Sequence, residues 1–375
     1  MRAVTIYSTS KCNLRCKHCG VGADQDAPRQ QQTTAELMRI LEQLASRHVR
    51  AVTILGGETT IYRRDLPEIL DRAGELGINV SLNTNLTAYP RIEPLLEKPA
   101  LRSLIVSLDG ASAATHDVQR GPGTFAKTVR NLMLVGASPR AQTRELLIQI
   151  AFVISGINCL DTPAMLPLAT ELHATHLNVK NVKLTGRAKE NSGLLKLDQR
   201  QLLRAYSLLI VQWMLTRELE LEVFVPPAFA VYLNRRFGLN FPTVEHHACG
   251  GTNVFSYVDL LGNHLPCPAM SFEESQAHGF ATPQPGVNLF SDDIEATLQS
   301  PLFTEFESNR HGRVHIGKMF PCHQCMYRNQ CVPCGAELIK GEQSDAVDIC
   351  SAIHACGDEH VPGIRAELWG SPVQA

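Results

Sequence analysis

The chain has 375 residues, a hydrophobic fraction of 44% and a formal net charge of −2. Its length exceeds the usual size of one domain, so we expect two domains with a sizeable core. The near-neutral charge argues against nucleic-acid and anionic-membrane partners. The sequence shows neither a signal peptide nor an apolar stretch of the roughly 20 residues that span a bilayer, so we expect a cytoplasmic protein.

Short apolar runs alternate with segments of helical periodicity through the first half of the chain. The runs are Ala3–Ser8, Ala51–Leu55, Ile78–Leu82, Ser103–Leu108, Leu146–Ile154 and His176–Leu184. The helical segments are Thr34–Arg47, Asp65–Leu76, Tyr89–Leu96, Phe125–Val135 and Thr162–Leu172. This alternation predicts a mainly parallel sheet that is buried on both faces. Periodicity leaves open whether the sheet is a six-stranded partial barrel or an open doubly wound sheet.

A helix over Leu197–Arg217 and a strand over Leu219–Val225 should follow, before Pro226 and Pro227 break the pattern. Beyond about residue 240, Gly, Pro, His and Cys become frequent. Such a segment buries little apolar surface, so we expect a small domain that is held together by metal. The predicted division is 1–190, a bridging segment 191–240, and a cysteine-rich domain 241–375.

Twelve cysteines in an intracellular chain favour thiolate–metal chemistry over disulfides. Three of them form the motif Cys12-x3-Cys16-x2-Cys19, directly after the first predicted strand. Thiolates are the preferred ligands of [4Fe–4S] clusters, and three thiolates leave one iron open to chelate another molecule. A zinc site with His18 as fourth ligand is the alternative, although this spacing is not usual for zinc.

The segment from Cys12 to Cys19, Cys-Asn-Leu-Arg-Cys-Lys-His-Cys, resembles the signature of the radical S-adenosylmethionine (SAM) superfamily. The resemblance implies a partial (β/α)6 TIM-like barrel over about residues 1–190. It also implies a [4Fe–4S] cluster whose open iron binds the amino and carboxylate groups of SAM. Electron transfer into SAM then yields a 5′-deoxyadenosyl radical that takes hydrogen from a substrate.

Further residues at predicted strand ends fit the same resemblance. Gly56-Gly57-Glu58 resembles the superfamily's GGE motif, which contacts the SAM amino group. Here Thr59 replaces the usual proline. The resemblance places Ser107 and Asp109 near the SAM ribose and Arg187 near the SAM carboxylate. Asn83 and Asn158 also end predicted strands, where α/β folds put their sites. The other expected cofactor-binding residues are therefore Asn83, Ser107, Asp109, Asn158 and Arg187.

Eight cysteines follow residue 248, and they could ligate two four-cysteine centres of zinc or iron–sulfur type. Gly262 suits a tight hairpin that would bring Cys249 and Cys267 together. The pattern resembles the SPASM extension of radical SAM enzymes, which usually binds two auxiliary [4Fe–4S] clusters. The resemblance assigns the distal cluster to Cys322, Cys325, Cys331 and Cys350, and the cluster nearer the barrel to Cys249, Cys267 and Cys334. Either Cys356 completes the nearer cluster or that cluster keeps an open iron.

Cys159 is the only cysteine between the two groups. Burial as a small hydrophobic side chain is the first expectation for it. The alternative is a catalytic role as hydrogen-atom donor, since Cys159 follows the fifth predicted strand.

The resemblance implies an oxidoreductase that acts on a ribosomal peptide, with flavodoxin or ferredoxin as electron donor. Because Cys12 is so close to the start of the sequence, we expect leader recognition by a separate peptide-binding protein. A sugar or aminocyclitol dehydrogenase or epimerase is the second reading, and a sulfatase-maturase-like enzyme is the third. The non-enzyme alternative is a zinc-stabilised binding module or an iron–sulfur electron carrier.

Overall fold

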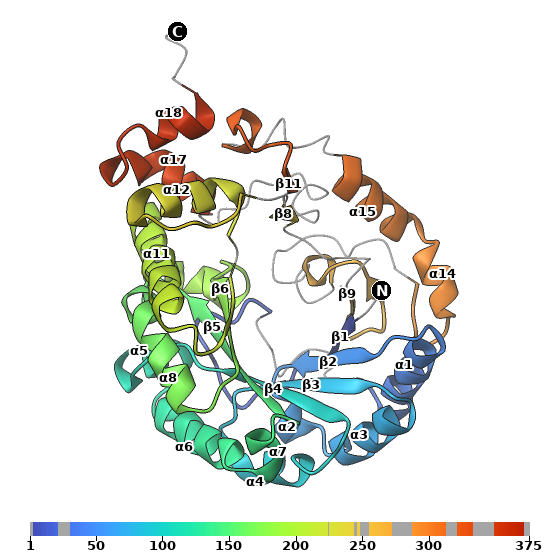
Figure 1. Ribbon diagram of the computed structural model, residues 1–375. Helices are drawn as coiled ribbons and strands as arrows, with labels where there is room; N and C mark the ends of the chain where they lie inside the picture. Colours follow the sequence, from blue (N-terminus) through green and yellow to red (C-terminus); the bar gives the residue numbers. More distant parts are fainter. Residues whose placement is uncertain are drawn as a thin grey trace.

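The computed structural model describes residues 3–21, 31–223, 225–243, 246–247, 255–271, 287–312, 321–332 and 349–370. A curved sheet lies at the centre, and the helices pack around its outer side (Figure 1). The strand order is β10-β9-β1-β2-β3-β4-β5-β6-β7, and β1 to β6 are all parallel in sequence order. A doubly wound sheet reverses its strand order at a switch point, and this one does not. The partial (β/α)6 barrel is therefore confirmed.

All six predicted strands form. They are β1 (Ala3–Thr9), β2 (Ala51–Gly56), β3 (Asn79–Thr84), β4 (Leu101–Ser107), β5 (Leu147–Ile154) and β6 (His176–Asn181). The predicted helical segments become α1 (Thr34–Ser46), α3 (Leu66–Glu75), α4 (Tyr89–Ile92), α6 (Thr124–Gly136), α8 (Met165–Glu171) and α11 (Gln199–Thr216). Helix α5 (Ala113–Arg120) was not predicted, because most of its eight residues are polar.

Helix α1 shows why these segments fold locally. It begins with a capping box, in which the Thr33 hydroxyl accepts from the Glu36 amide and the Glu36 carboxylate accepts from the Thr33 amide. The buried face that it turns toward the sheet repeats at helical spacing: Leu37, Ile40, Leu41 and Leu44.

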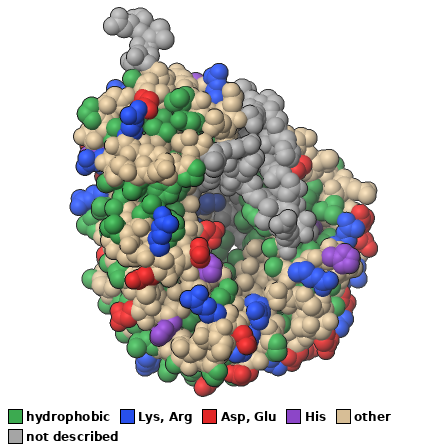
Figure 2. Space-filling view, in the orientation of Figure 1, with side chains coloured by type: hydrophobic (Ala, Val, Ile, Leu, Met, Phe, Trp, Pro, Cys, Tyr) green, Lys and Arg blue, Asp and Glu red, His purple; other side chains and the backbone are tan. Residues whose placement is uncertain are grey.

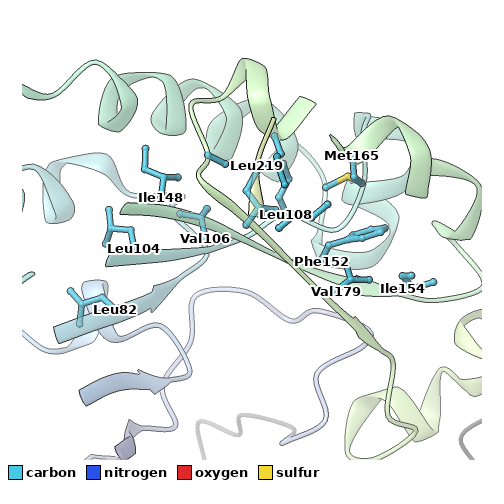
Figure 3. Packing of buried hydrophobic residues seen from close by; sticks show 14 of the residues in the cluster. Leu82, Leu104, Val106, Leu108, Ile148, Phe152, Ile154, Met165, Val179 and Leu219 are labelled. Carbon is cyan, nitrogen blue, oxygen red and sulfur yellow. The ribbon is translucent and has the colours of Figure 1, made fainter. Parts of the chain in front are cut away.

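The sheet is not equally buried on its two faces. Along β5 the exposure alternates, and its buried side chains Ile148, Phe152 and Ile154 pack in the cluster shown in Figure 3. The residues between them are only half-buried. Polar side chains from neighbouring strands bond along this second face: Gln149 donates to Ser103 Oγ at 2.9 Å, and Asn178 donates to Gln149 Oε1 at 3.0 Å. The expected burial of the sheet on both faces therefore holds only in part. The concave face carries polar groups, of which Ser103 and Asn178 are buried and those of β5 are half-buried.

The C-terminal part extends the same sheet. Strand β9 (Phe255–Val258) pairs parallel with β1, and β10 (His264–Leu265) returns antiparallel through a hairpin. Gly262 has φ +87° in that hairpin, as its predicted turn requires. At the other edge, β7 (Glu220–Glu222) pairs with β6. The predicted boundary near residue 240 therefore does not coincide with an edge of the sheet.

Pro227 starts a helix where the sequence suggested a break. Helix α12 (Pro227–Phe237) has this proline in its first turn, where the missing amide costs nothing. The remaining C-terminal elements are α14 (Ile294–Leu298), α15 (Pro301–Gly312), α17 (Ile349–Cys356), α18 (Ile364–Trp369), and the paired strands β8 (His246–His247) and β11 (Cys331–Val332).

No helix in the described ranges combines the length and the apolar character needed to cross a bilayer. On the described part of the face in Figure 2, basic and acidic side chains are interspersed. This distribution agrees with the near-zero net charge.

One buried histidine gives the fold a pH dependence. His264 in β10 is fully buried, and its Nε2 lies 2.7 Å from Ser256 Oγ in β9. Burial lowers the pKa of His264 to about 3, whereas an unperturbed imidazole titrates near 6.5. Below about pH 6.5 the unfolded chain therefore binds a proton on His264 that the folded chain does not bind. The contribution of His264 to the free energy of unfolding is complete above that pH and is lost as the pH falls toward 3.

We expect His264→Gln to remove this contribution. Between pH 6 and pH 5, the free energy of unfolding of the variant should fall by about 1 kcal/mol less than that of the wild type. Urea denaturation at both pH values measures the difference, and equal declines in the two proteins would contradict the assignment.

Candidate active site

The loop that carries Cys12, Cys16 and Cys19 follows β1 and is fixed on one side by the end of β2. Gly57 donates its amide to the Thr9 carbonyl at 2.6 Å, and Glu58 donates to the Lys11 carbonyl at 2.7 Å. This approach requires glycine, because a Cβ on Gly57 would lie 2.2 Å from the Lys11 oxygen. The GGE segment therefore has a structural role in seating the start of the cysteine loop.

The other side of the loop is fixed by the segment after β6. The Arg187 amide donates to the Cys19 carbonyl at 3.1 Å, and Arg187 Nε donates to the Cys16 carbonyl at 3.2 Å. Gly186 has φ +51°, and a side chain there would meet the Gly20 oxygen at 2.4 Å. Arg187 thus lies beside the cysteine loop. Its predicted contact with the carboxylate group of SAM stays a prediction.

The three cysteines are free thiols on one loop. Their chemistry fits a [4Fe–4S] cluster, in which each thiolate binds a different iron. Burial raises the pKa of the Cys12 thiol to about 12 and also raises the pKa of Cys16. Such thiols become thiolates only when a cationic centre replaces the proton.

Glu58 is a buried carboxylate with no cation beside it in the described chain. It accepts from Thr60 Oγ1 at 2.5 Å, from Thr84 Oγ1 at 2.8 Å and from the Asn85 amide at 2.6 Å. Burial raises its pKa despite these bonds. A ligand ammonium group would complete this site, because it would supply the missing positive charge.

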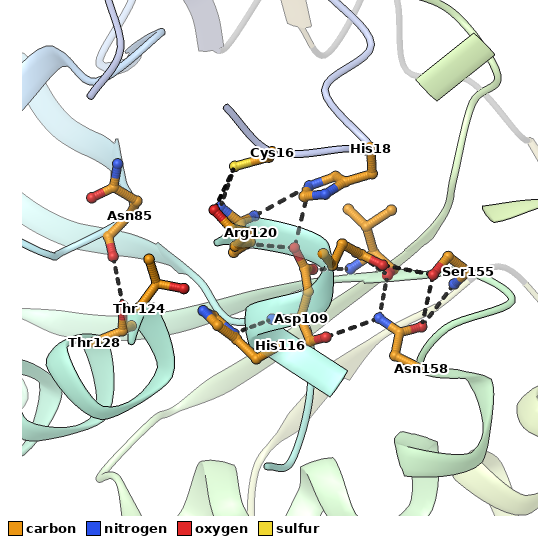
Figure 4. Close-up of polar contacts among 12 residues, drawn as sticks. Cys16, His18, Asn85, Asp109, His116, Arg120, Thr124, Thr128, Ser155 and Asn158 are labelled. Carbon is orange, nitrogen blue, oxygen red and sulfur yellow. Dashed lines mark hydrogen bonds and ion pairs between the residues drawn. The ribbon is translucent and has the colours of Figure 1, made fainter. Parts of the chain in front are cut away.

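A buried ion pair lies behind the cysteine loop (Figure 4). Asp109, just after β4, contacts Arg120 Nε at 2.5 Å and His18 Nε2 at 3.2 Å, and its Oδ1 accepts from the Val153 amide at 2.7 Å. Burial alone would raise the pKa of Asp109, but the Arg120 guanidinium holds it below its ordinary value, with a smaller effect of His18. Burial lowers the pKa of His18 to about 4, so its imidazole is neutral at pH 7.

Arg120 joins this pair to the cysteine motif. Its Nη1 lies 3.9 Å from Cys16 Sγ, and Lys17 donates its amide to the Gln119 carbonyl at 2.8 Å. Asp117 does not pair with Arg120; it accepts instead from the amides of Gly123 and Phe125 at the start of α6. Asp117 and Arg120 lie three residues apart on α5, and their side chains have different partners.

The remaining cofactor-binding candidates lie around the same end of the sheet. Asn158 donates to the carbonyls of Asp109 (3.0 Å) and Val153 (2.8 Å), so its buried side chain fixes these strand ends. Ser107 is buried at the end of β4, and Asn83 is half-buried in β3. Their contacts with SAM stay predictions.

The expected cofactor-binding residues do not include three groups that the structure brings to this end of the sheet: Arg120, Thr60 and Asn85. Asn85 donates to Asn13 in the cysteine loop at 2.9 Å. Its place one residue after β3, in Asn-Thr-Asn, was the available signal. Nothing in the sequence marks Thr60 as a partner of Glu58.

Cys159 lies in the short 3-10 helix Cys159–Ala164 and is 4% exposed, within the main hydrophobic cluster. Burial raises the pKa of its thiol. This environment agrees with the first expectation, a packed side chain, and the role of hydrogen donor stays an untested prediction.

A second cysteine site lies at the C-terminal end of the chain. Four cysteines from three segments line one pocket together with the first residues of α12 and the end of α18. They are Cys322, Cys325, Cys331 and Cys350, the set that the resemblance assigns to one cluster. Their lining of one pocket supports that assignment and does not by itself distinguish iron–sulfur from zinc.

Of the cysteines expected to hold the cluster nearer the barrel, the structure describes only some. Cys249 and Cys334 lie outside the described residues, whereas Cys267 is buried beside Met270 and Phe306. Cys356 packs in the main hydrophobic cluster and donates to the Ala352 carbonyl at 3.0 Å. These surroundings give Cys356 a packing role, and its assignment as a cluster ligand stays a prediction with no support from its neighbours.

Comparison with known proteins gives several matches. A family model described as the radical SAM superfamily matches residues 6–138. The AdoMet-dependent heme synthase of Methanosarcina barkeri is 27% identical over 277 residues, which is 71% of this chain and 76% of that protein. The mycofactocin maturase MftC of Mycobacterium tuberculosis is 28% identical over 266 residues, covering 71% of this chain and 64% of that protein.

Solved structures agree on the fold. SuiB of Streptococcus suis bound to S-adenosylmethionine has a TM-score of 0.67 at 21% identity, covering 93% of this chain and 76% of SuiB. A second SuiB structure contains the precursor peptide SuiA. At 21% identity, this likeness shows that the two proteins share a fold.

We expect Gly57→Ala to prevent the cysteine loop from seating, because the new methyl group meets the Lys11 carbonyl. After anaerobic reconstitution with iron and sulfide, the variant should lack the iron of one cluster relative to wild type. Gly193→Ala is the matched control, since a methyl group there meets nothing within 4 Å. Equal iron content in all three proteins would contradict the role of Gly57.

Proposed function

The chain belongs to the radical SAM superfamily and has the SPASM type of C-terminal extension, and from this premise we propose that it oxidatively modifies a ribosomal peptide. The proposal rests mainly on the match to a peptide maturase, the mycofactocin maturase, over 71% of the chain. The PqqA peptide cyclase of Bradyrhizobium diazoefficiens matches over an equal share. A protein of this kind is an enzyme with iron–sulfur clusters and SAM as cofactors.

When bound, the first cluster and SAM would supply the radical chemistry, namely reductive cleavage of SAM followed by removal of hydrogen from the substrate. In our proposal, Cys12, Cys16 and Cys19 hold this cluster. Glu58 binds the ammonium group of SAM, because it is a buried carboxylate without a cation among the described residues. The Asp109–Arg120 pair keeps the cysteine loop in place by its contact with Cys16.

A second candidate, oxidation of a small molecule, is supported by one specific observation. The AdoMet-dependent heme synthase matches this chain over a larger share of its own length than the maturase does, 76% against 64%. The polar groups on the concave face of the sheet, such as the half-buried Gln149 and the buried Asn178, could bind either substrate.

The substrate is tested by incubating the reconstituted protein with SAM, reductant and each short peptide encoded beside its gene, with and without any separate leader-binding protein encoded there. A mass change in a peptide supports the first candidate. Turnover of a tetrapyrrole or sugar, with no peptide changed, would replace it by the second.

The radical step itself gives a direct prediction. Cys12→Ala should abolish the formation of 5′-deoxyadenosine from SAM, a loss of at least 100-fold, because the cluster loses one of its three protein ligands. Cys159→Ala is the matched control and should keep the wild-type rate of this step. Chromatographic measurement of 5′-deoxyadenosine under anaerobic conditions decides, and wild-type cleavage by Cys12→Ala would contradict the assignment of the cluster.

The electron donor is proposed to be an acidic flavodoxin or ferredoxin. A hollow beside the cysteine loop is walled by Asn13, Leu14 and Arg15, which lie between two cluster ligands. Lys127 also lines it, and no acidic residue does. Arg120 lines it too, but its charge is balanced by Asp109. A negatively charged donor that docks there would be one loop away from the cluster.

We expect Arg15→Glu to slow SAM cleavage driven by flavodoxin by about tenfold, since it reverses a charge at this hollow. Cleavage driven by dithionite, which needs no docking protein, should stay unchanged. Arg102→Glu is the control, because Arg102 is exposed near the opposite, amino end of β4. Equal losses with both reductants, or an equal loss in the control, would contradict docking at this hollow.

A further inference from the structure

One residue that lines the four-cysteine pocket has a side-chain N–H group without a hydrogen-bond partner in the described chain. Trp369, at the end of α18, lines the pocket together with Cys322, Cys325, Cys331 and Cys350. Its side chain is 7% exposed, and its Nε1 is buried without a hydrogen-bond partner. A buried N–H group without an acceptor costs free energy, so such groups normally have a partner.

The other tryptophan of the chain shows the usual arrangement. Trp213 in α11 donates from Nε1 to the Leu219 carbonyl at 2.8 Å. The chain contains only these two tryptophans. The unsatisfied indole therefore belongs specifically to the one that lines the cysteine pocket.

The indole is held in place by the segments that supply the cysteines. Its ring packs edge-on against His354 at 5.1 Å between centroids, and His354 lies on α17, the helix that carries Cys350. The carbonyl of Leu368, the residue before Trp369, accepts a hydrogen bond from the amide of Met326 at 2.8 Å, and Met326 directly follows Cys325. Trp369 is thus tied to two of the three cysteine-bearing segments, so any group that joins these segments lies beside it.

We propose that the Trp369 indole N–H donates a hydrogen bond to a sulfur of the iron–sulfur cluster held by Cys322, Cys325, Cys331 and Cys350, and that this bond raises the reduction potential of the cluster. The inference rests on the proposed function, in which these cysteines hold such a cluster. Cluster sulfurs carry negative charge, which increases when the cluster gains an electron, so an N–H donor stabilises the reduced state more than the oxidised state. The cluster then accepts an electron from a substrate radical more readily.

In this proposal Trp369 contacts the cluster and does not contact the substrate. Trp369→Phe keeps an aromatic ring in the pocket and removes only the N–H donor. Trp213→Phe is the matched control, because its indole bonds a backbone carbonyl remote from the cysteines.

The test uses the full chain with Cys12, Cys16 and Cys19 replaced by Ala, so that the SAM-binding cluster does not contribute. Iron and sulfide are measured first, and redox titration followed by electron paramagnetic resonance then gives the potential. We expect Trp369→Phe to shift the oxidised–reduced equilibrium about tenfold toward the oxidised form, which is 59 mV for one electron. Trp213→Phe should leave the potential unchanged.

A second measurement avoids any change at position 369. With 15N in the indole nitrogen and Trp213 replaced by Phe, the reduced cluster should show a hyperfine coupling to the single labelled nitrogen. A protein that binds iron through the four cysteines but shows neither the coupling nor the shift overturns the role of Trp369 and leaves the proposed function intact. A protein in which Cys322→Ala and Cys350→Ala release no iron has no cluster in this pocket, and both this inference and the proposed auxiliary cluster fall.

Discussion

The rest of this structure depends on how one loop is held between the end of β2 and the segment after β6. The loop after β1 carries the three N-terminal cysteines, and backbone bonds tie it to Gly57 and Glu58 on one side and to Arg187 on the other. At Gly57 and Gly186 the backbone segments approach so closely that only glycine fits. The main chain therefore holds the cysteine loop at both of its ends.

Charge is distributed around this loop in two different ways. Asp109 is buried together with Arg120, so the pair is neutral within itself and can stabilise the fold without a ligand. Glu58 is buried with hydroxyl and amide donors only, and its pKa is raised by burial. A site that must bind a cationic group benefits from such an incomplete arrangement, because the ligand supplies the charge that the protein omits.

The C-terminal part also brings cysteines together, but from separate segments of the chain. There the pocket is formed by segments far apart in the chain, Cys322–Gln324, Cys331–Val332 and Ile349–Cys356, which share few regular contacts of their own. The segments meet against α12 and α18, elements whose apolar side chains belong to the main core. A metal centre in this pocket would join these segments to one another, and α17 is itself packed in the main core.

The sequence by itself determined the alternation of strands and helices, the place of the cysteine loop after β1 and the grouping of candidate residues at one end of a parallel sheet. These are local properties, since apolar periodicity and a short motif are written in consecutive residues. Only the tertiary structure decided that β9 extends the sheet beside β1, that Asp109 pairs with Arg120 and that Cys356 packs in the core while Cys350 lines a pocket. Such facts depend on which side chains meet across long separations in the chain, and composition and spacing carry no information about that.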